Sequence, residues 1–128
     1  MKQSAKLQLF NYLYEQFSDL DVPVIETKDL NQELSYPFIA IQTVSDDVNR
    51  KTFDSFAGNP TATVHIWSVD ENKGVNDALY LKVQAILLED IELDGFSLFN
   101  PQMTVNEIIE NESNQALEHT TCLLYTSP

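Results

Sequence analysis

The sequence predicts an α+β fold in which a mostly antiparallel sheet of four or more strands is packed by two helices. Its 128 residues, 43% of them hydrophobic, suit a single domain that spans residues 1–128. Two segments have the apolar spacing of amphipathic helices, and several others alternate apolar and polar residues as half-buried strands do. The order helix, two or three strands, helix, three or four strands fits hairpins packed by two helices better than a doubly wound sheet.

The first element is an amphipathic helix over residues 5–18. Its apolar side chains recur every three or four residues, at Leu7, Phe10, Leu13, Tyr14, Phe17 and Leu20. Residues 22–25 predict a short edge strand, because Pro23 has no N–H to donate to a neighbouring strand. We expect a polar loop over residues 26–36 to follow.

Two strands with a long connection come next. Residues 38–44 are rich in β-branched and aromatic side chains, which are typical of strands. Residues 45–59 are mostly polar and predict a long loop, of the kind that is usually functional or mobile. Residues 61–68 predict a second strand. One face of this strand carries Ala62, Val64 and Ile66, and the other carries Thr63, His65 and Trp67.

The second half begins with a helix and continues with strands. The apolar stripe of the helix, expected over residues 74–88, is formed by Val75, Leu79, Val83, Ile86 and Leu87. Asp94-Gly95 is a strong hairpin signal between Ile91–Leu93 and Phe96–Leu98. Residues 103–109 predict a further strand, and residues 111–114 a turn. The final strand, residues 115–126, places Leu117, His119, Thr121, Leu123 and Tyr125 on one side.

The charge balance excludes several classes of partner. Twenty acidic and seven basic residues give a net charge of −13, and residues 83–128 contain eight acidic residues and no Lys or Arg. Binding to nucleic acid or to anionic lipid requires basic patches, so we expect neither sequence-specific nucleic-acid binding nor membrane binding. One cysteine, no apolar run of membrane-spanning length and no signal-peptide pattern at the start together predict a soluble intracellular domain.

Motifs for catalysis or metal binding are sparse. Residues 90–95 imitate the first half of a calcium loop, but position 12 is Pro101 where a bidentate Glu is required. His65, His119 and Cys122 are the available nitrogen and sulfur ligands, and no pair of them has zinc-ligand spacing. We expect Cys122 to be a small buried apolar residue and His65 to lie beside Trp67 on a sheet face. The sequence predicts no catalytic residue, cofactor or metal site.

The first helix has more aromatic side chains than one core-facing stripe needs. Phe10, Tyr12, Tyr14 and Phe17 cluster on it, and core packing explains most of them. The remaining aromatic surface is expected to meet a partner, most simply another copy of the same chain.

The order of elements resembles the tail-terminator (tail-completion) proteins of long-tailed bacteriophages. Three segments carry the resemblance: Tyr36-Pro37-Phe38-Ile39-Ala40-Ile41, the strand Thr61–Ser68 with His65-Ile66-Trp67, and the turn Asp70-Glu71-Asn72-Lys73-Gly74 that enters the second helix. The resemblance covers most of the chain as an order of elements and rests on few specific residues, because these proteins share no catalytic signature. The strong acidity and the strand-ended C-terminus depart from the family pattern and leave open a neighbouring neck protein.

The resemblance implies a structural protein without enzymatic activity. Such subunits form a hexameric ring that caps the head-proximal end of the tail tube, ends tube growth and offers a surface to the head connector. The implied partners are other copies of the chain, the tail tube protein and the head-connector protein, with DNA passing through an acidic lumen. The implied location is the virion tail or neck, and the host cytoplasm during assembly. Our candidate subunit-interface residues are Arg50, Lys51, Phe53, Phe56, Tyr12 and Tyr14.

Two alternatives remain open at this point. The acidic second half also suits a small binding or regulatory protein that docks a basic partner or mimics nucleic acid. A metal-dependent enzyme would have to use Asp90, Glu92, Asp94 and His119.

Overall fold

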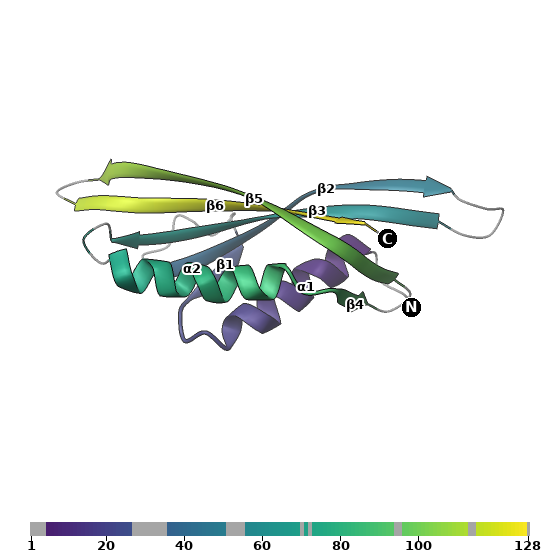
Figure 1. Ribbon diagram of the computed structural model, residues 1–128, viewed down its shortest axis with the longest axis horizontal. Helices are drawn as coiled ribbons and strands as arrows, with labels where there is room; N and C mark the ends of the chain where they lie inside the picture. The colour runs from purple at the N-terminus through teal and green to yellow at the C-terminus, as the bar shows by residue number, and fades with distance from the viewer. Residues whose placement is uncertain are drawn as a thin grey trace.

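One six-stranded sheet forms the centre of the molecule. The computed structural model describes residues 5–26, 36–50, 56–69, 71, 73–93, 96–112 and 115–127. The strands are β1 (Val24–Glu26), β2 (Phe38–Arg50), β3 (Phe56–Val69), β4 (Ile91–Leu93), β5 (Phe96–Glu112) and β6 (Gln115–Ser127). They lie in the order β1-β2-β3-β6-β5-β4 (Figure 1). Every pair is antiparallel except β1 with β2. The predicted α+β fold with a mostly antiparallel sheet is therefore confirmed.

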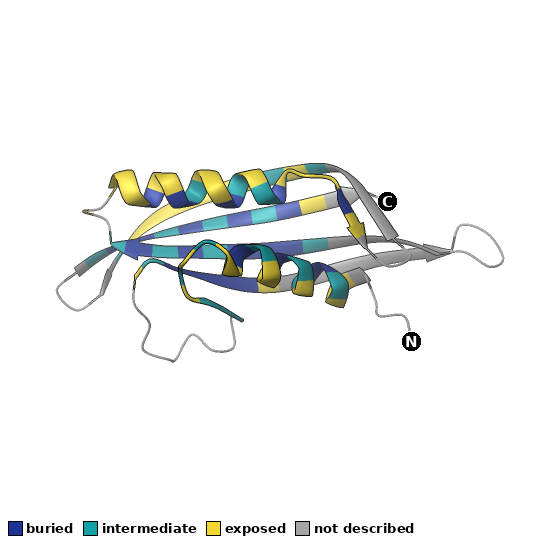
Figure 2. Cartoon of the chain, turned by 90° about the horizontal axis from the view of Figure 1, so that it is seen from below, coloured by how far each residue is buried: buried dark blue, intermediate teal, exposed yellow. Residues whose placement is uncertain are grey.

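Both helices lie on the same face of the sheet. The helix α1 (Ala5–Ser18) packs against β1, β2 and β3, and α2 (Lys73–Leu87) packs against β3 and against α1. Figure 2 views the molecule from this side and shows buried residues along the inner surfaces of both helices and along the central strands. The core between the layers is formed by Leu9, Leu13, Phe17, Ile39, Ile41, Ala62, Val64, Ile66, Leu79, Val83, Leu87, Ile91, Cys122 and Leu124.

The helix α1 is amphipathic, as predicted, but its buried face is rotated from the expected stripe. Leu7 and Tyr14 of that stripe are 44% and 43% exposed. Leu9, Leu13 and Phe17 recur every four residues, lie on one face and are fully buried. The helix ends where the sequence turns acidic, and Asp21 adopts a φ of 60°, in a left-handed region that Asp tolerates better than most residues. The chain then enters β1 at the sheet edge, where the N–H of Ile39 donates to the carbonyl of Pro23 at 2.9 Å.

The helix α2 has the predicted bounds within one residue, but its buried face is rotated from the expected one. Val75, expected on the apolar stripe, is 57% exposed, and Asn76 is buried in its place beside Leu79, Val83 and Leu87. Nδ2 of Asn76 donates to the carbonyl of Val69 at 2.9 Å. This bond ties the start of the helix to the end of β3, and it accounts for a polar residue on the inner face.

The expected loop over residues 45–59 is wrong for most of its length. The strand β2 continues to Arg50 and β3 begins at Phe56, so residues 45–50 and 56–59 form a two-stranded ladder. This hairpin projects past the helices, at the right of Figure 1. A strand in such a position does not need the apolar alternation that marks a half-buried strand. Pro60 fits there because β6 begins to pair with β3 only at Thr61.

The C-terminal strands form the predicted hairpins, but residues 96–98 and 103–109, expected as separate strands, belong to one continuous strand, β5, which runs on to Glu112 inside the expected turn. The strand β4 pairs with the beginning of β5, with Ile91 opposite Leu98, and the Asp94-Gly95 signal lies between them, outside the described residues. The strands β5 and β6 then form the longest hairpin, from Phe99 opposite Ser127 to Glu112 opposite Gln115. Among the described residues, neither helix has the length and apolar character that a membrane span requires.

Candidate functional site

Long stretches of the sheet edges have no neighbouring strand among the described residues. On one edge, β4 pairs only with Phe96–Leu98 of β5, so residues 102–112 pair with β6 alone. On the other edge, β1 pairs only with Ile39–Ile41 of β2, so residues 42–50 pair with β3 alone. An unpaired strand edge presents N–H and C=O groups to which another strand can bond.

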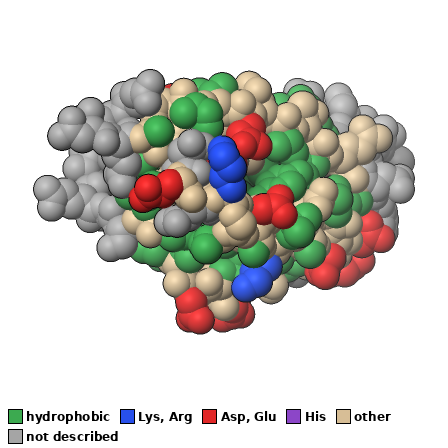
Figure 3. Space-filling model, turned by 60° about the vertical axis from the view of Figure 1, so that its left-hand side comes forward, with side chains coloured by type: hydrophobic (Ala, Val, Ile, Leu, Met, Phe, Trp, Pro, Cys, Tyr) green, Lys and Arg blue, Asp and Glu red, His purple; other side chains and the backbone are tan. Residues whose placement is uncertain are grey.

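Apolar side chains lie beside the β5 edge. Val105 and Ile109 are 39% and 51% exposed, and Ile108 on the opposite face of the sheet is also exposed. Further exposed apolar residues are Val75 and Leu81 on α2 and Leu88 just after its end. Figure 3, which brings forward the end of the molecule at the left of Figure 1, shows hydrophobic side chains at the surface among acidic and basic ones. Exposed apolar groups along an open edge are typical of a surface that another protein covers.

The candidate interface residues lie in two separate places. Arg50 and Phe56 are paired at the outer ends of β2 and β3, and Lys51 and Phe53 lie between them, outside the described residues. Tyr14 on α1 is 43% exposed. Tyr12 is half-buried and packs against the core, where burial first, and then the charge of Glu89, raises its pKa. Of the two tyrosines, Tyr14 therefore offers the larger accessible surface.

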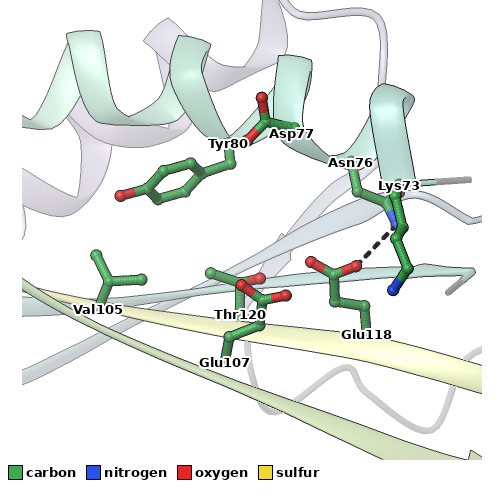
Figure 4. A pocket seen from close by; sticks show the side chains of 8 residues that line it. All are labelled: Lys73, Asn76, Asp77, Tyr80, Val105, Glu107, Glu118 and Thr120. Carbon is green, nitrogen blue, oxygen red and sulfur yellow. Dashed lines mark hydrogen bonds between the residues drawn. The ribbon is translucent and has the colours of Figure 1, made fainter.

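A half-open cavity of about 330 Å³ lies between α2 and the strands β5 and β6 (Figure 4). Its lining comes from α2 (Lys73, Asn76, Asp77 and Tyr80), β5 (Val105 and Glu107) and β6 (Glu118 and Thr120). The buried amide of Asn76 donates from Nδ2 to Oε2 of Glu118 at 3.2 Å. This contact holds a buried carboxylate in place and links the helix to β6, so its evident role is structural.

The sheet face opposite the helices carries a cluster of aromatic and imidazole rings, which we call the His–Trp cluster: Phe38, His65, Trp67 and His119. Trp67 lies opposite both Phe38 on β2 and His119 on β6. The rings of Trp67 and His119 are stacked, with centroids 3.8 Å apart and an interplanar angle of 15°. Those of Phe38 and Trp67 are 6.4 Å apart. His65 lies beside Trp67, as expected.

The two histidines of the cluster are in direct contact. Nδ1 of His65 is 2.8 Å from Nε2 of His119, and Oγ1 of Thr121 lies 3.4 and 3.5 Å from the same two atoms. The outer nitrogens face oxygens, since Nε2 of His65 is 3.5 Å from Oε1 of Gln42 and Nδ1 of His119 is 3.8 Å from Oε1 of Glu110. Burial lowers the pKa of both histidines, helped at His65 by the charge of His119 and opposed at His119 by Glu110.

Cys122 is separated from both histidines by the sheet. It is fully buried on the helix side, and burial raises the pKa of its thiol to about 11. His119 is three residues earlier on the same strand and therefore points to the other face. The prediction that Cys122 is a small buried apolar residue is confirmed, and the arrangement provides no Cys–His pair.

The acidic residues near the β4 turn do not join His119. Asp90 and Glu92 are exposed, Ile91 between them is buried, and Asp94 lies outside the described residues. Position 98 pairs with Ile91, whereas position 108 pairs with His119, so the two places are ten residues, or about 33 Å, apart along β5. Within the described ranges, no three His, Cys, Asp or Glu side chains come close enough to hold one metal ion.

This chain is similar in fold to a chain of known structure. That chain is from the "Virion of native gene transfer agent (GTA) particle", with a TM-score of 0.63 and 8% sequence identity. The match covers 97% of this chain and 93% of that chain. At this identity the likeness concerns the fold. No protein-family model matches the sequence, and no curated protein matches it either.

The side-chain contacts between different strands could not be predicted from the sequence. The alternation of Thr63, His65 and Trp67 correctly placed the histidine and the tryptophan on one face. Their meeting with His119 depends on the register of β3 against β6, which no local pattern fixes. The Asn76–Glu118 contact was not predicted, because it depends on how α2 packs against β6.

Proposed function

We propose that this chain is a structural subunit of a phage-like particle and that it assembles into a ring, most simply a hexamer, at the head-proximal end of a tail tube. The observation that carries the proposal is the likeness in fold, over nearly the whole length of both chains, to a chain of a gene transfer agent virion. In this role the ring ends tube growth and joins the tail to the head connector. The role needs geometry and self-recognition rather than reactive groups, and the protein acts without a cofactor.

The open sheet edges support assembly with further copies. A ring requires two different surfaces on each subunit, one for each neighbour. The edge of β5 at residues 102–112 and the edge of β2 at residues 42–50 lie at opposite sides of the sheet. A strand or loop of the next subunit on either edge would use backbone groups that have no strand partner in the described part of this chain.

The distribution of charge supports a contact through the β2–β3 hairpin. The chain has seven basic residues, and Arg50 and Lys51 are the only adjacent pair. In a ring of strongly acidic subunits, a basic hairpin end facing an acidic surface of the neighbour lowers the like-charge repulsion. An acidic lumen would also let DNA pass without adsorbing to the wall.

Electron microscopy of the purified chain with a matched charge variant tests this proposal. We expect negatively stained images of the parent protein to show rings with a central opening. The Arg50→Glu/Lys51→Glu variant should keep its circular dichroism spectrum and lose the rings, whereas Lys82→Glu on α2 should retain them. Rings that persist in the double variant would exclude the hairpin contact, and images without rings at any concentration would exclude the ring itself.

A second candidate function follows from the acidity of residues 83–128. A small acidic binding or regulatory protein would capture basic partners from a host lysate at moderate salt. A tail component should not retain nucleic-acid-binding proteins under these conditions. Retention of such proteins by the parent, reduced by added salt, would favour the second function over the first.

A further inference from the structure

The cavity between α2 and the sheet opens beside the free edge of β5. Val105 and Glu107, which line it, are both exposed and belong to the stretch of β5 that pairs with β6 alone. Ligand pockets range from about 300 to 1,000 Å³, so this cavity of about 330 Å³ lies at the small end. It has room for one long side chain and some water, and a molecule lying along the β5 edge can supply that side chain.

The charges of the lining favour a positively charged group. Asp77, Glu107 and Glu118 are acidic and Lys73 is basic, which leaves an excess of two negative charges. Glu107 lies opposite Thr120, and Glu118 is two residues away from Thr120 on β6. The two glutamates are therefore diagonal neighbours on the helix side of the sheet, about 7–8 Å apart at the backbone. A cation between them is attracted by both carboxylates.

The carboxylate of Glu118 is buried and held in place. The residue is 9% exposed, and Nδ2 of Asn76 donates to its Oε2 at 3.2 Å. Buried carboxylates are usually balanced by an opposite charge, whereas a neutral amide supplies a hydrogen bond and no charge. A cation that enters the cavity adds the charge that the amide lacks.

The remaining lining suits an arginine side chain. Figure 4 shows the ring of Tyr80 extending from α2 above Val105, with Glu107 and Glu118 on the strands below. The aliphatic part of arginine packs on apolar groups such as Val105. Its planar guanidinium stacks on aromatic rings and donates to carboxylates in pairs. Lysine can supply the charge but neither the stacking nor the paired hydrogen bonds.

The single arginine of the chain cannot reach the cavity of its own subunit. Arg50 is at the outer end of β2, in the hairpin that projects past the helices (Figure 1). It pairs with Phe56, whereas Glu118 pairs with Ser68, so the two places are twelve residues, or about 40 Å, apart along β3. The projecting hairpin instead extends toward whatever lies next to the molecule.

We propose that the cavity binds Arg50 of a neighbouring copy of the chain, with the guanidinium between the carboxylates of Glu107 and Glu118 and against the ring of Tyr80. This inference rests on the proposed ring and names the acidic surface that its basic hairpin meets. Each subunit extends its hairpin end to one neighbour and binds that of the other neighbour in its cavity. The two contact surfaces differ, as a closed ring requires.

A charge exchange between the two positions tests the inference by sedimentation velocity. Glu107→Lys puts a positive charge at the cavity and should weaken self-association about tenfold or more, as Arg50→Glu should. The double variant Arg50→Glu/Glu107→Lys restores opposite charges and should associate about tenfold more strongly than either single variant. Asp90→Lys makes the same change of charge at an exposed position outside the cavity and should associate like the parent.

Circular dichroism of each variant is the folding control. Glu107→Gln keeps the shape of the side chain, should weaken association several-fold, and replaces Glu107→Lys if that variant fails to fold. Rings in the parent, together with unchanged association of the Glu107 variants or a double variant no stronger than the single ones, would overturn the inference and leave the proposed ring standing. A parent that stays a protomer would exclude the ring and this contact with it.

Discussion

At the scale of single residues, the buried polar contacts determine how α2 is set against the sheet. Asn76 is one of few buried polar residues described, and it donates to both the carbonyl of Val69 and the carboxylate of Glu118. Removing its side chain leaves the carbonyl of Val69 and the carboxylate of Glu118 without this donor. A buried acceptor that loses its partner costs more than the lost hydrogen bond alone.

We therefore expect Asn76→Ala to lower the free energy of unfolding by about 1–3 kcal/mol. Asp77→Ala, at the next and exposed position, is the matched control and should change it by less than about 0.5 kcal/mol. Urea denaturation followed by circular dichroism measures both values. Equal stabilities of the two variants would mean that the Asn76 contacts do not set the position of α2.

Cys122 provides a test of the packing between the layers. Its thiol is fully buried with a pKa raised to about 11, so only about one thiol in a thousand is ionised at pH 8. We expect a thiol-specific reagent to label the native protein roughly 100-fold more slowly than the urea-unfolded chain. No other thiol contributes, because the chain has one cysteine. Rapid labelling of the native protein would show that the core opens at β6.

Residue roles that depend on one strand could be predicted, and those that depend on two could not. The alternation along residues 115–126 correctly separated His119 from Cys122. The contact of His119 with His65 required the β3–β6 register, and the burial of Glu118 required the position of α2. Both are set by tertiary packing rather than by local sequence.

At the scale of elements, apolar periodicity was informative wherever an element has one buried face. It predicted α1 over residues 5–18, with Leu13 and Phe17 buried as expected. It failed on the β2–β3 hairpin, where residues 45–50 and 56–59 form strands beyond the two-layered body of the molecule. Backbone pairing alone can extend a hairpin there, and polar sequence then resembles a loop.

The helix α1 offers a paired test of this pattern. Phe17 is fully buried, so Phe17→Ala should lower the free energy of unfolding by about 3–5 kcal/mol through lost burial and a residual cavity. Tyr14 is 43% exposed one turn earlier, and Tyr14→Ala should cost much less. Thermal or urea unfolding measures the difference. If the two variants are equally destabilised, the helix does not pack through the face described.

At the scale of the whole molecule, the sheet and helices leave an open, partly apolar side at β5. The helix α1 packs against β1, β2 and β3, α2 leaves a half-open cavity over β5 and β6, and β4 covers only the beginning of β5. The same strand carries exposed Val105 and Ile109. A monomer gains nothing from such a surface, whereas an assembly buries it.

A pair of double variants examines whether this side is buried on assembly. Val105→Lys/Ile109→Lys should leave the free energy of unfolding nearly unchanged, because both positions are exposed, and should weaken self-association at least tenfold. Val75→Lys/Leu81→Lys, at exposed apolar positions of α2, is the control and should associate like the parent. Light scattering after size-exclusion chromatography measures both. If only the α2 variant dissociates, the subunit contact lies on the helix instead.

The most direct test of the proposal that this chain is the subunit of a ring is the mass of the protein in solution. Sedimentation velocity across a concentration series, from micromolar to near millimolar, should show the 14.6 kDa protomer giving way to one discrete, closed species of about six times that mass. A sharp limit to growth is expected, because a ring uses every contact surface of its subunits. A protomer mass that stays constant over the whole series would contradict the account.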